Sequence, residues 1–171
     1  MAETTRLFLM RHAHAVSELE DPARPLSEKG REQARAIADF LRARGSIQVE
    51  RVWHSPLIRA RETADIVCDH LELTATRREI GGLLPWDDVR GVARRLSGFG
   101  YLLLIVGYEP HLGRLASMLV CGTVDVEMID FKKGGMLCLE REATKSQTIL
   151  WRVRWYVTPS LLLATETESA D

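Results

Sequence analysis

The chain has 171 residues, of which 46% are hydrophobic and 27% are charged. These proportions are near those of ordinary globular proteins, which excludes wholesale disorder and predicts one domain with its own core. The formal net charge is −1, so no long-range field attracts nucleic acid or an anionic membrane surface.

No apolar run approaches the roughly 20 residues that cross a bilayer, and the first residues lack the pattern of a signal peptide. We therefore expect a cytoplasmic protein with no membrane or nucleic-acid partner. The three cysteines are widely spaced, which predicts reduced thiols and no metal site. They are Cys68, Cys121 and Cys138.

The first predicted element is a strand over residues 7–10, Leu-Phe-Leu-Met, which leads directly into Arg11 and His12. A short run of this kind is typical of a strand buried inside a parallel sheet. Residues that follow such a strand lie at the carboxyl edge of the sheet, where open α/β sheets bind their ligands. The polar segment 17–25, rich in acidic residues and proline, is predicted to be a loop.

Helices and strands then alternate along the chain. Ser27 is the predicted N-cap of a helix that ends at Gly45. The later predictions, in order, are a strand at 47–53, a helix at 57–71, an edge strand at 74–80, a loop at 81–86, a helix at 89–96, a central strand at 101–106, a turn at 107–110, a helix at 111–120, and paired strands at 136–140 and 148–156.

This alternation predicts the fold class. We expect a three-layer α/β/α sandwich with a largely parallel central sheet. The composition predicts a single domain over residues 1–164 and a frayed acidic tail over residues 165–171.

Three strand-to-helix junctions carry the polar side chains of interest. Arg11 and His12 form the first, residues 55–64 (SPLIRARETA) the second, and residues 106–112 (VGYEPHL) the third. In a doubly wound sheet all three would lie at the same edge. Two or more guanidinium groups and an imidazole at that edge predict a pocket for an anionic substrate.

Four segments resemble the motifs of the histidine phosphatase superfamily, in the family's order and spacing over residues 6–120. LMRHA at 9–13 is similar to its Arg-His-Gly signature, with alanine in place of glycine, and SPLIRARETA to its Ser-Pro-x-x-Arg-Ala-x-x-Thr segment. RPLSEKGREQA and VGYEPHLGRLASML resemble two further segments. The length is similar to that of the small SixA-type phosphohistidine phosphatases. The resemblance implies a phosphoglycerate mutase-like fold and phosphatase activity.

The resemblance also implies roles for individual residues. His12 is expected to attack phosphorus and to form a phosphohistidine intermediate that water then hydrolyses. Arg11 and Arg59 are expected to hold the phosphoryl oxygens with their planar guanidinium groups. Arg24, in the loop after the first strand, is expected to add a phosphate contact or to meet the rest of the substrate. No metal or other cofactor is required.

The chain departs from the family at Tyr108, where a second catalytic histidine is normal. Either its hydroxyl binds the phosphate, or the pocket has lost a cationic donor. Loss of one such donor lowers rates by a factor on the order of 10²–10³. His111, three residues later, is another possible replacement, although a following helix would direct it elsewhere.

The general acid is a second open point. Relatives that cleave phosphate esters place a glutamate after the third strand, where this chain has Glu79. Asp87 and Asp88 are further candidates, although solvated loop charges are the favoured interpretation. Their loop, GGLLPWDDV, resembles the SixA type, and a protonated imidazole leaves easily without a strong acid.

We therefore expect the substrate and partner to be a phosphohistidine-bearing protein of a phosphorelay or phosphotransfer system. One alternative is a small-molecule phosphomonoesterase that uses Glu79 as its acid. Another is a phosphate- or phosphohistidine-binding module with little activity, because Tyr108 replaces the second histidine.

Overall fold

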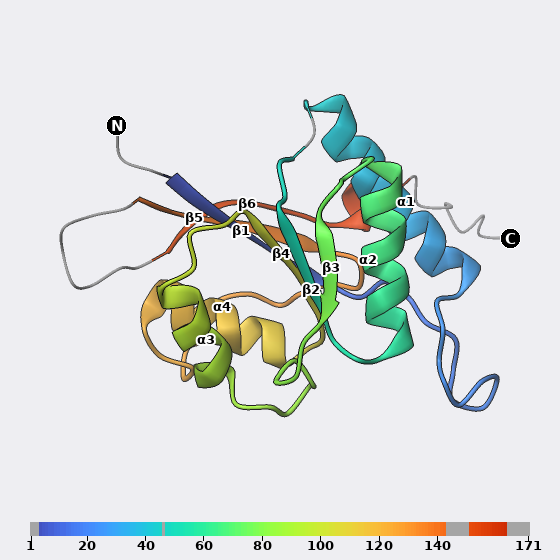
Figure 1. The fold of residues 1–171 in the computed structure, drawn as a ribbon. Coiled ribbons are helices and arrows are strands. Elements are labelled where there is room, and N and C mark those ends of the chain that lie inside the picture. The colour runs from blue at the N-terminus through green and yellow to red at the C-terminus, as the bar shows by residue number, and fades with distance from the viewer. Residues whose placement is uncertain (1–3, 46, 143–150, 164–171) are drawn as a thin grey trace, which may run out of the picture.

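The computed structural model describes residues 4–45, 47–142 and 151–163, which form a mixed α/β fold around one six-stranded sheet (Figure 1). The strands are β1 (Thr4–Arg11), β2 (Arg51–His54), β3 (Thr76–Glu79), β4 (Leu103–Gly107), β5 (Met136–Glu142) and β6 (Arg152–Val157). The helices are α1 (Glu28–Ala43), α2 (Ile58–His70), α3 (Val89–Ser97) and α4 (His111–Cys121), followed by the 3-10 turn η1 (Pro159–Leu161).

The strand order is β3-β2-β4-β1-β5-β6. The first four strands are parallel, whereas β5 runs antiparallel to β1 and β6 runs antiparallel to β5. The predicted α/β class with a largely parallel sheet is confirmed, as are the edge position of β3 and the central position of β4. The start of the last predicted strand, at 148, and the tail over 165–171 lie outside the described residues.

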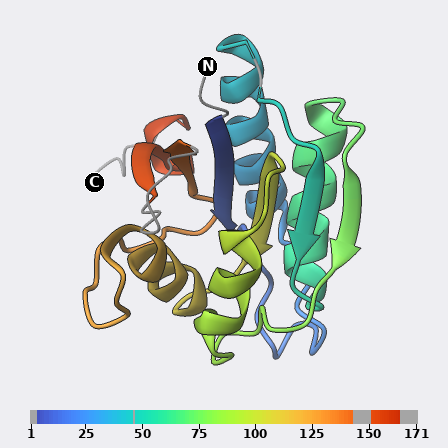
Figure 2. The ribbon, with the colours of Figure 1, turned by 60° about the vertical axis from the view of Figure 1, so that its left-hand side comes forward.

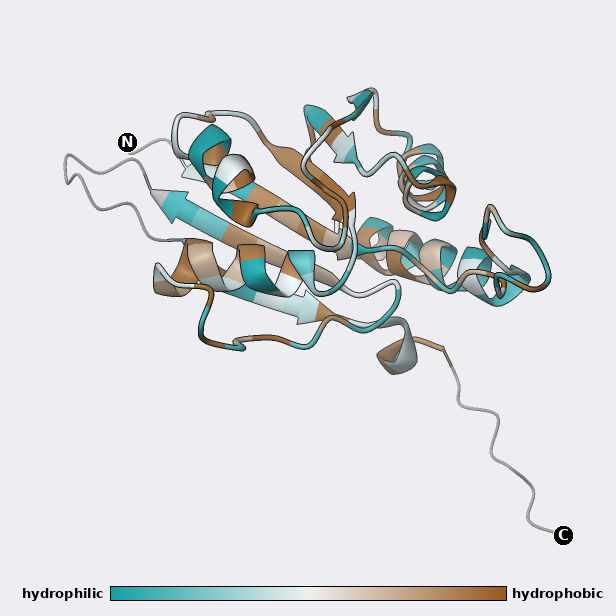
Figure 3. Cartoon of the chain, turned by 90° about the horizontal axis from the view of Figure 1, so that it is seen from below, coloured by the Kyte–Doolittle hydropathy of each residue, from teal (hydrophilic) through white to brown (hydrophobic). Residues whose placement is uncertain are grey.

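Two helices cover each face of the sheet. Figure 2 shows α1 and α2 on one side and α3 and α4 on the other. Alternate residues of β1 enter the two cores, Phe8 and Met10 on the first side and Leu7 and Leu9 on the second. Burial on both sides explains the continuous apolar run, and in Figure 3 the strands in the middle of the sheet are brown. None of the helices described is long and apolar enough to cross a membrane.

Most predicted boundaries agree with the structure. Ser27 caps α1, its Oγ accepting a hydrogen bond of 3.1 Å from the Gly30 amide. The edge strand is shorter than predicted, Thr76–Glu79 against 74–80, and β4 begins at Leu103 rather than at 101. Strand β2 also begins later than predicted, because residues 47–50 are not part of it. The register explains the difference: Arg51 is opposite Leu103, the first residue of β4, so the chain before Arg51 extends beyond the neighbouring strand.

Gly30 allows α1 to approach the segment that follows His12. A Cβ atom at Gly30 would lie 1.9 Å from the carbonyl oxygen of His14. Gly91, in α3, has no atom within 4 Å of the corresponding position. The two helical glycines therefore form a matched pair, one in a close contact and one in open space.

We predict that Gly30→Ala lowers the free energy of unfolding by about 1–3 kcal/mol, because backbone must move to admit the methyl group. Gly91→Ala should raise it by about 0.5–1 kcal/mol, since alanine restricts the unfolded chain more than glycine does. Urea denaturation of the two variants and the wild type measures both effects. A Gly30→Ala protein as stable as Gly91→Ala would contradict the packing described above.

Candidate active site

The three predicted junctions meet at the carboxyl edge of the sheet, because β1, β4 and β2 are neighbours. Backbone hydrogen bonds continue past the strand ends. The His12 amide donates to the carbonyl oxygen of Gly107 at 2.9 Å, and the Ser55 amide donates to that of Val106 at 3.1 Å. The prediction that these segments lie side by side is therefore confirmed.

The imidazole of His12 is buried at this edge, with 6% of the residue exposed. Its Nδ1 lies 2.7 Å from the carbonyl oxygen of Ala13. A carbonyl oxygen can only accept, so Nδ1 carries the proton and Nε2 keeps its lone pair. Burial, which has the largest effect, and the positive charges of Arg59 and Arg11 together lower the pKa of His12 from 6.5 to about 3. The ring is thus neutral at pH 7 and can act as a nucleophile through Nε2.

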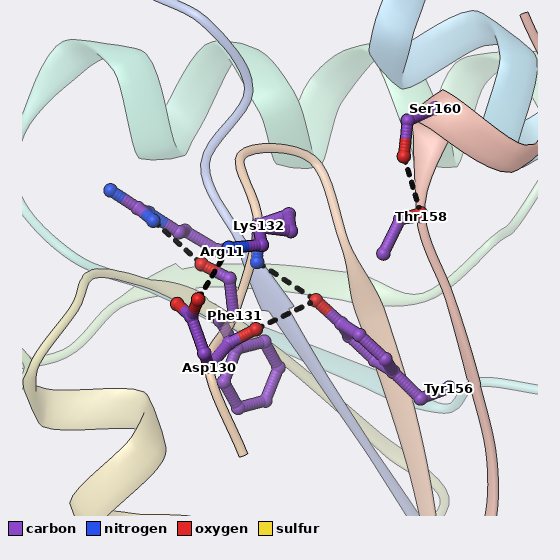
Figure 4. Close-up of polar contacts among 7 residues, drawn as sticks. All are labelled: Arg11, Asp130, Phe131, Lys132, Tyr156, Thr158 and Ser160. Carbon is purple, nitrogen blue, oxygen red and sulfur yellow. Dashed lines mark hydrogen bonds and ion pairs between the residues drawn. The ribbon is translucent and has the colours of Figure 1, made fainter.

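Arg11 is half-buried, and one nitrogen of its guanidinium group makes a hydrogen bond to the backbone. Its Nη1 donates a hydrogen bond of 2.6 Å to the carbonyl oxygen of Phe131, as Figure 4 shows. Its Nε is buried and has no hydrogen-bond partner among the described residues. Arg11 is therefore anchored while a second donor stays available to an anion.

Arg59 lies in the first turn of α2, and Thr63 fixes that turn to the end of β1. The Thr63 hydroxyl accepts a hydrogen bond of 3.1 Å from the Ala13 amide and donates one of 2.7 Å to the carbonyl oxygen of Arg59. The Nε of Arg59 is also buried without a partner in the described part of the chain. Two guanidinium groups with an unused donor thus act electrostatically on His12.

Tyr108 lies between His12 and Arg59. Its ring centroid is 4.7 Å from that of His12, and the guanidinium carbon of Arg59 is 4.7 Å from the Tyr108 centroid. Its hydroxyl is buried and unpartnered within the described residues. Burial raises the pKa of Tyr108 to about 12, so the phenol keeps its proton and can donate a hydrogen bond. The structure brings Tyr108 into the group predicted from the sequence.

Arg24 also joins this group. It has a φ of +52°, and its Nε donates to the carbonyl oxygen of Val16 at 3.2 Å. Its positive charge acts on Arg59 and on the Tyr108 hydroxyl. The charge of Arg24 therefore acts on the pocket, and its expected contact with the phosphate or with the rest of the substrate stays a prediction.

The acid candidates have different surroundings, and two strands of the sheet lie between Glu79 and His12. Glu79 ends β3, three strands away from β1, a backbone separation of about 14 Å. Its side chain is exposed. Asp87 and Asp88 serve the backbone of their own loop: Asp87 accepts from the Leu84 amide at 2.8 Å, and Asp88 caps α3 by accepting from the Arg90 amide at 3.0 Å.

His111 is not part of the group either. It is the first residue of α4 and is 1% exposed. The charges that act on its ring are those of Asp87, Asp88 and Arg114, and none of these belongs to the pocket.

Sequence reasoning missed two residues near the site. The positive charge of Lys133 acts on His12, although Lys133 lies far along the chain from all the motifs. The only sequence signal was the glycine pair that follows it, which indicates a close backbone approach. Glu109 precedes α4, and its Oε1 accepts a hydrogen bond of 3.0 Å from the Gly113 amide in the first turn of that helix. Burial raises the pKa of Glu109 to about 7, which cannot be derived from sequence alone.

The side chains around His12 are donors and cations, which suit an oxyanion. Arg11, Arg59 and Tyr108 each offer an unused buried donor. In the part of the chain that the structure describes, no three His, Cys, Asp or Glu side chains gather as they would around a metal ion. A tetrahedral anion held beside the Nε2 of His12 would be placed for nucleophilic attack on its central atom.

Comparison with known proteins identifies relatives of this chain. Residues 7–80 match the family model described as the histidine phosphatase superfamily (branch 1). The phosphohistidine phosphatase SixA of Escherichia coli (strain K12) is 31% identical over 122 residues, which are 68% of this chain and 75% of that protein.

Solved structures agree with this likeness. The protein histidine phosphatase SixA complexed with tungstate has a TM-score of 0.79 at 26% identity, over 92% of this chain and 99% of that one. A mycobacterial glucosyl-3-phosphoglycerate phosphatase has a TM-score of 0.66 at 18% identity, over 88% and 97%. At 18% identity, the similarity to the glucosyl-3-phosphoglycerate phosphatase concerns the fold alone.

We predict that the His12 ring stays neutral from pH 8 down to about pH 4, because its pKa is lowered to about 3. Its Cε1–H NMR resonance, assigned by comparison with His12→Gln, should not move over that range. A folded pKa below 6.5 also means that unfolding takes up a proton between these two values. Wild-type stability should therefore fall as the pH falls from 6.5, and His12→Gln should remove that part of the slope. A His12 resonance that titrates near pH 6.5 would contradict the buried, neutral ring.

Proposed function

This chain belongs to the histidine phosphatase superfamily, and from that membership we propose that it removes the phosphoryl group from a phosphohistidine in a protein. The family and its structural relatives indicate a phosphatase, a hydrolase of phosphoryl bonds. The observation that carries the proposal is the buried neutral imidazole of His12 beside two guanidinium groups with unused donors.

In the first step the phosphoryl oxygens bind the guanidinium groups of Arg11 and Arg59. The Nε2 lone pair of His12 attacks phosphorus in line, and the bond from phosphorus to the substrate imidazole breaks. His12 then carries the phosphoryl group on Nε2 and a proton on Nδ1. The carbonyl oxygen of Ala13 accepts that proton's hydrogen bond and so stabilises the cationic ring.

In the second step water attacks phosphorus and the bond to Nε2 breaks. The products are inorganic phosphate and the neutral ring of His12, ready for another cycle. The carbonyl oxygen of Phe131 holds the Arg11 guanidinium group through both steps, and the Thr63 hydroxyl holds the backbone that carries Arg59. Little reorganisation is then needed as charge redistributes on the phosphoryl oxygens.

Tyr108 gives this pocket a neutral donor where the family has a histidine. A hydroxyl hydrogen bond to phosphate is weaker than that of an imidazolium by about half. The burial of the Tyr108 hydroxyl without a partner supports a role as a phosphoryl ligand. We infer turnover at a reduced rate, with Tyr108 contributing to binding.

The leaving group favours phosphohistidine over a phosphate ester. An alkoxide must be protonated as it leaves, whereas a substrate imidazole is a good leaving group once it has taken a proton from solvent. The exposure of Glu79 and its distance from β1 support a site that does not depend on a strong protein acid. The substrate is then a phosphorelay or phosphotransfer protein.

The test compares two substrates, a phosphohistidine-bearing phosphotransfer protein and p-nitrophenyl phosphate. We predict phosphate release from the protein that falls at least about 10³-fold in His12→Asn, since the nucleophile is lost. The rate of phosphate release from the protein should stay within about twofold of wild type in Glu79→Gln. His70→Asn, which changes an exposed histidine paired with Asp39, is the matched control and should be fully active.

Two results would overturn the proposal. Hydrolysis of p-nitrophenyl phosphate alone, abolished in Glu79→Gln, would indicate a phosphomonoesterase with Glu79 as acid. Turnover that appears only in Tyr108→His would indicate a binding module that lost its activity with the second histidine.

A further inference from the structure

The segment before β5 is bonded directly to the backbone of the active site. The Gly134 amide donates to the carbonyl oxygens of Arg11 and His12, at 3.2 and 3.1 Å. In return, the Arg11 amide donates to the carbonyl oxygen of Gly135 at 3.0 Å. Lys133 precedes this pair of glycines, so its position relative to His12 is set by main-chain hydrogen bonds.

This close approach requires glycine at both positions. Gly134 has a φ of +74°, and a Cβ atom there would lie 2.9 Å from Cγ of Pro159. A Cβ atom at Gly135 would lie 2.6 Å from the hydroxyl of Tyr156. That hydroxyl also accepts a hydrogen bond of 2.8 Å from the Lys132 amide, which Figure 4 shows. The segment is therefore fixed on both sides.

Lys133 is half-buried and has no hydrogen bond or ion pair with any described residue. Burial lowers its pKa, and the charges that act on it, from Arg11, Arg24 and Lys29, are all positive and lower the pKa further. Repulsion between the Lys133 ammonium group and these positive charges raises the free energy of the pocket. A bound anion would offset that repulsion.

The neighbouring lysine has a different environment. Lys132 is exposed, and its ammonium group is paired with the carboxylate of Asp130 (Figure 4). The positive charge of Lys133 lowers the pKa of His12, whereas the charge of Lys132 is offset by its carboxylate partner. The chain thus offers two adjacent lysines of equal charge, one exposed and paired and the other half-buried beside the site.

We propose that the ammonium group of Lys133 is a further ligand of the phosphoryl group. It would supply the positive charge that a histidine at position 108 would otherwise bring. This inference rests on the proposed function, which places a phosphoryl group beside His12. Lysine is a common phosphate ligand that acts as a point charge, so it needs no second contact to fix its geometry.

The test measures the dissociation constant of tungstate, a tetrahedral oxyanion, by isothermal titration calorimetry. We predict that Lys133→Met weakens tungstate binding about 10- to 100-fold, the effect of one hydrogen bond to a charged group. Lys132→Met, the matched control, should stay within about twofold of wild type. Lys133→Arg should retain most of the affinity. Thermal unfolding checks that all three variants are folded.

Three outcomes would overturn the inference: no tungstate binding by the wild type, equal losses in the two lysine variants, or unchanged affinity in Lys133→Met. Slower turnover of a phosphohistidine protein by Lys133→Met at unchanged tungstate affinity would mean that Lys133 contacts the partner's surface, which also overturns it. A wild type that binds tungstate through Lys133 but hydrolyses no phosphohistidine would leave the inference standing and refute the proposed function.

Discussion

The hydrogen bond from the Nδ1 of His12 to the carbonyl oxygen of Ala13 is the interaction on which this site depends. It selects one tautomer of a buried ring and leaves Nε2 as the only nitrogen able to attack phosphorus. Burial and the nearby arginines keep the ring neutral, so the nucleophile needs no separate base. A ring with its proton on Nε2 would present a donor to the anion and could not react.

The fold places the residues that surround His12. Parallel pairing of β1 with β4, and of β4 with β2, brings three strand ends to one edge of the sheet. Thr63 then ties the turn that carries Arg59 to the Ala13 amide, and Gly134 ties the segment before β5 to the carbonyl of His12. Each of these links is a hydrogen bond to the backbone, so the segments that carry the cations are held in place before any anion arrives.

The sequence predicted the parts of this arrangement that depend on local pattern. The apolar run at 7–10 indicated a buried strand, and the three strand-to-helix junctions predicted which residues would meet, because carboxyl ends of parallel strands share an edge. The structure places the ring of Tyr108 beside that of His12, as the third junction predicted. Its stacking beneath the Arg59 guanidinium was not predictable, since it depends on the rotamers of two residues from different elements.

What could not be predicted depends on contacts between distant segments. The length of β2 follows from its register with β4, which no pattern within residues 47–53 reveals. Lys133 reaches the site only because Gly134 bonds to residues more than a hundred positions earlier. The raised pKa of Glu109 likewise depends on burial by the folded chain.

Trapping the phosphoenzyme tests whether His12 is the nucleophile and which of its nitrogens reacts. The protein would be quenched in base during turnover of a phosphohistidine substrate and analysed by ³¹P NMR and mass spectrometry. We predict an acid-labile phosphoryl group on the Nε2 of His12, and none in His12→Asn. Phosphate on Nδ1, phosphate on another residue, or full turnover in His12→Asn would contradict the role assigned to the bond between His12 and Ala13.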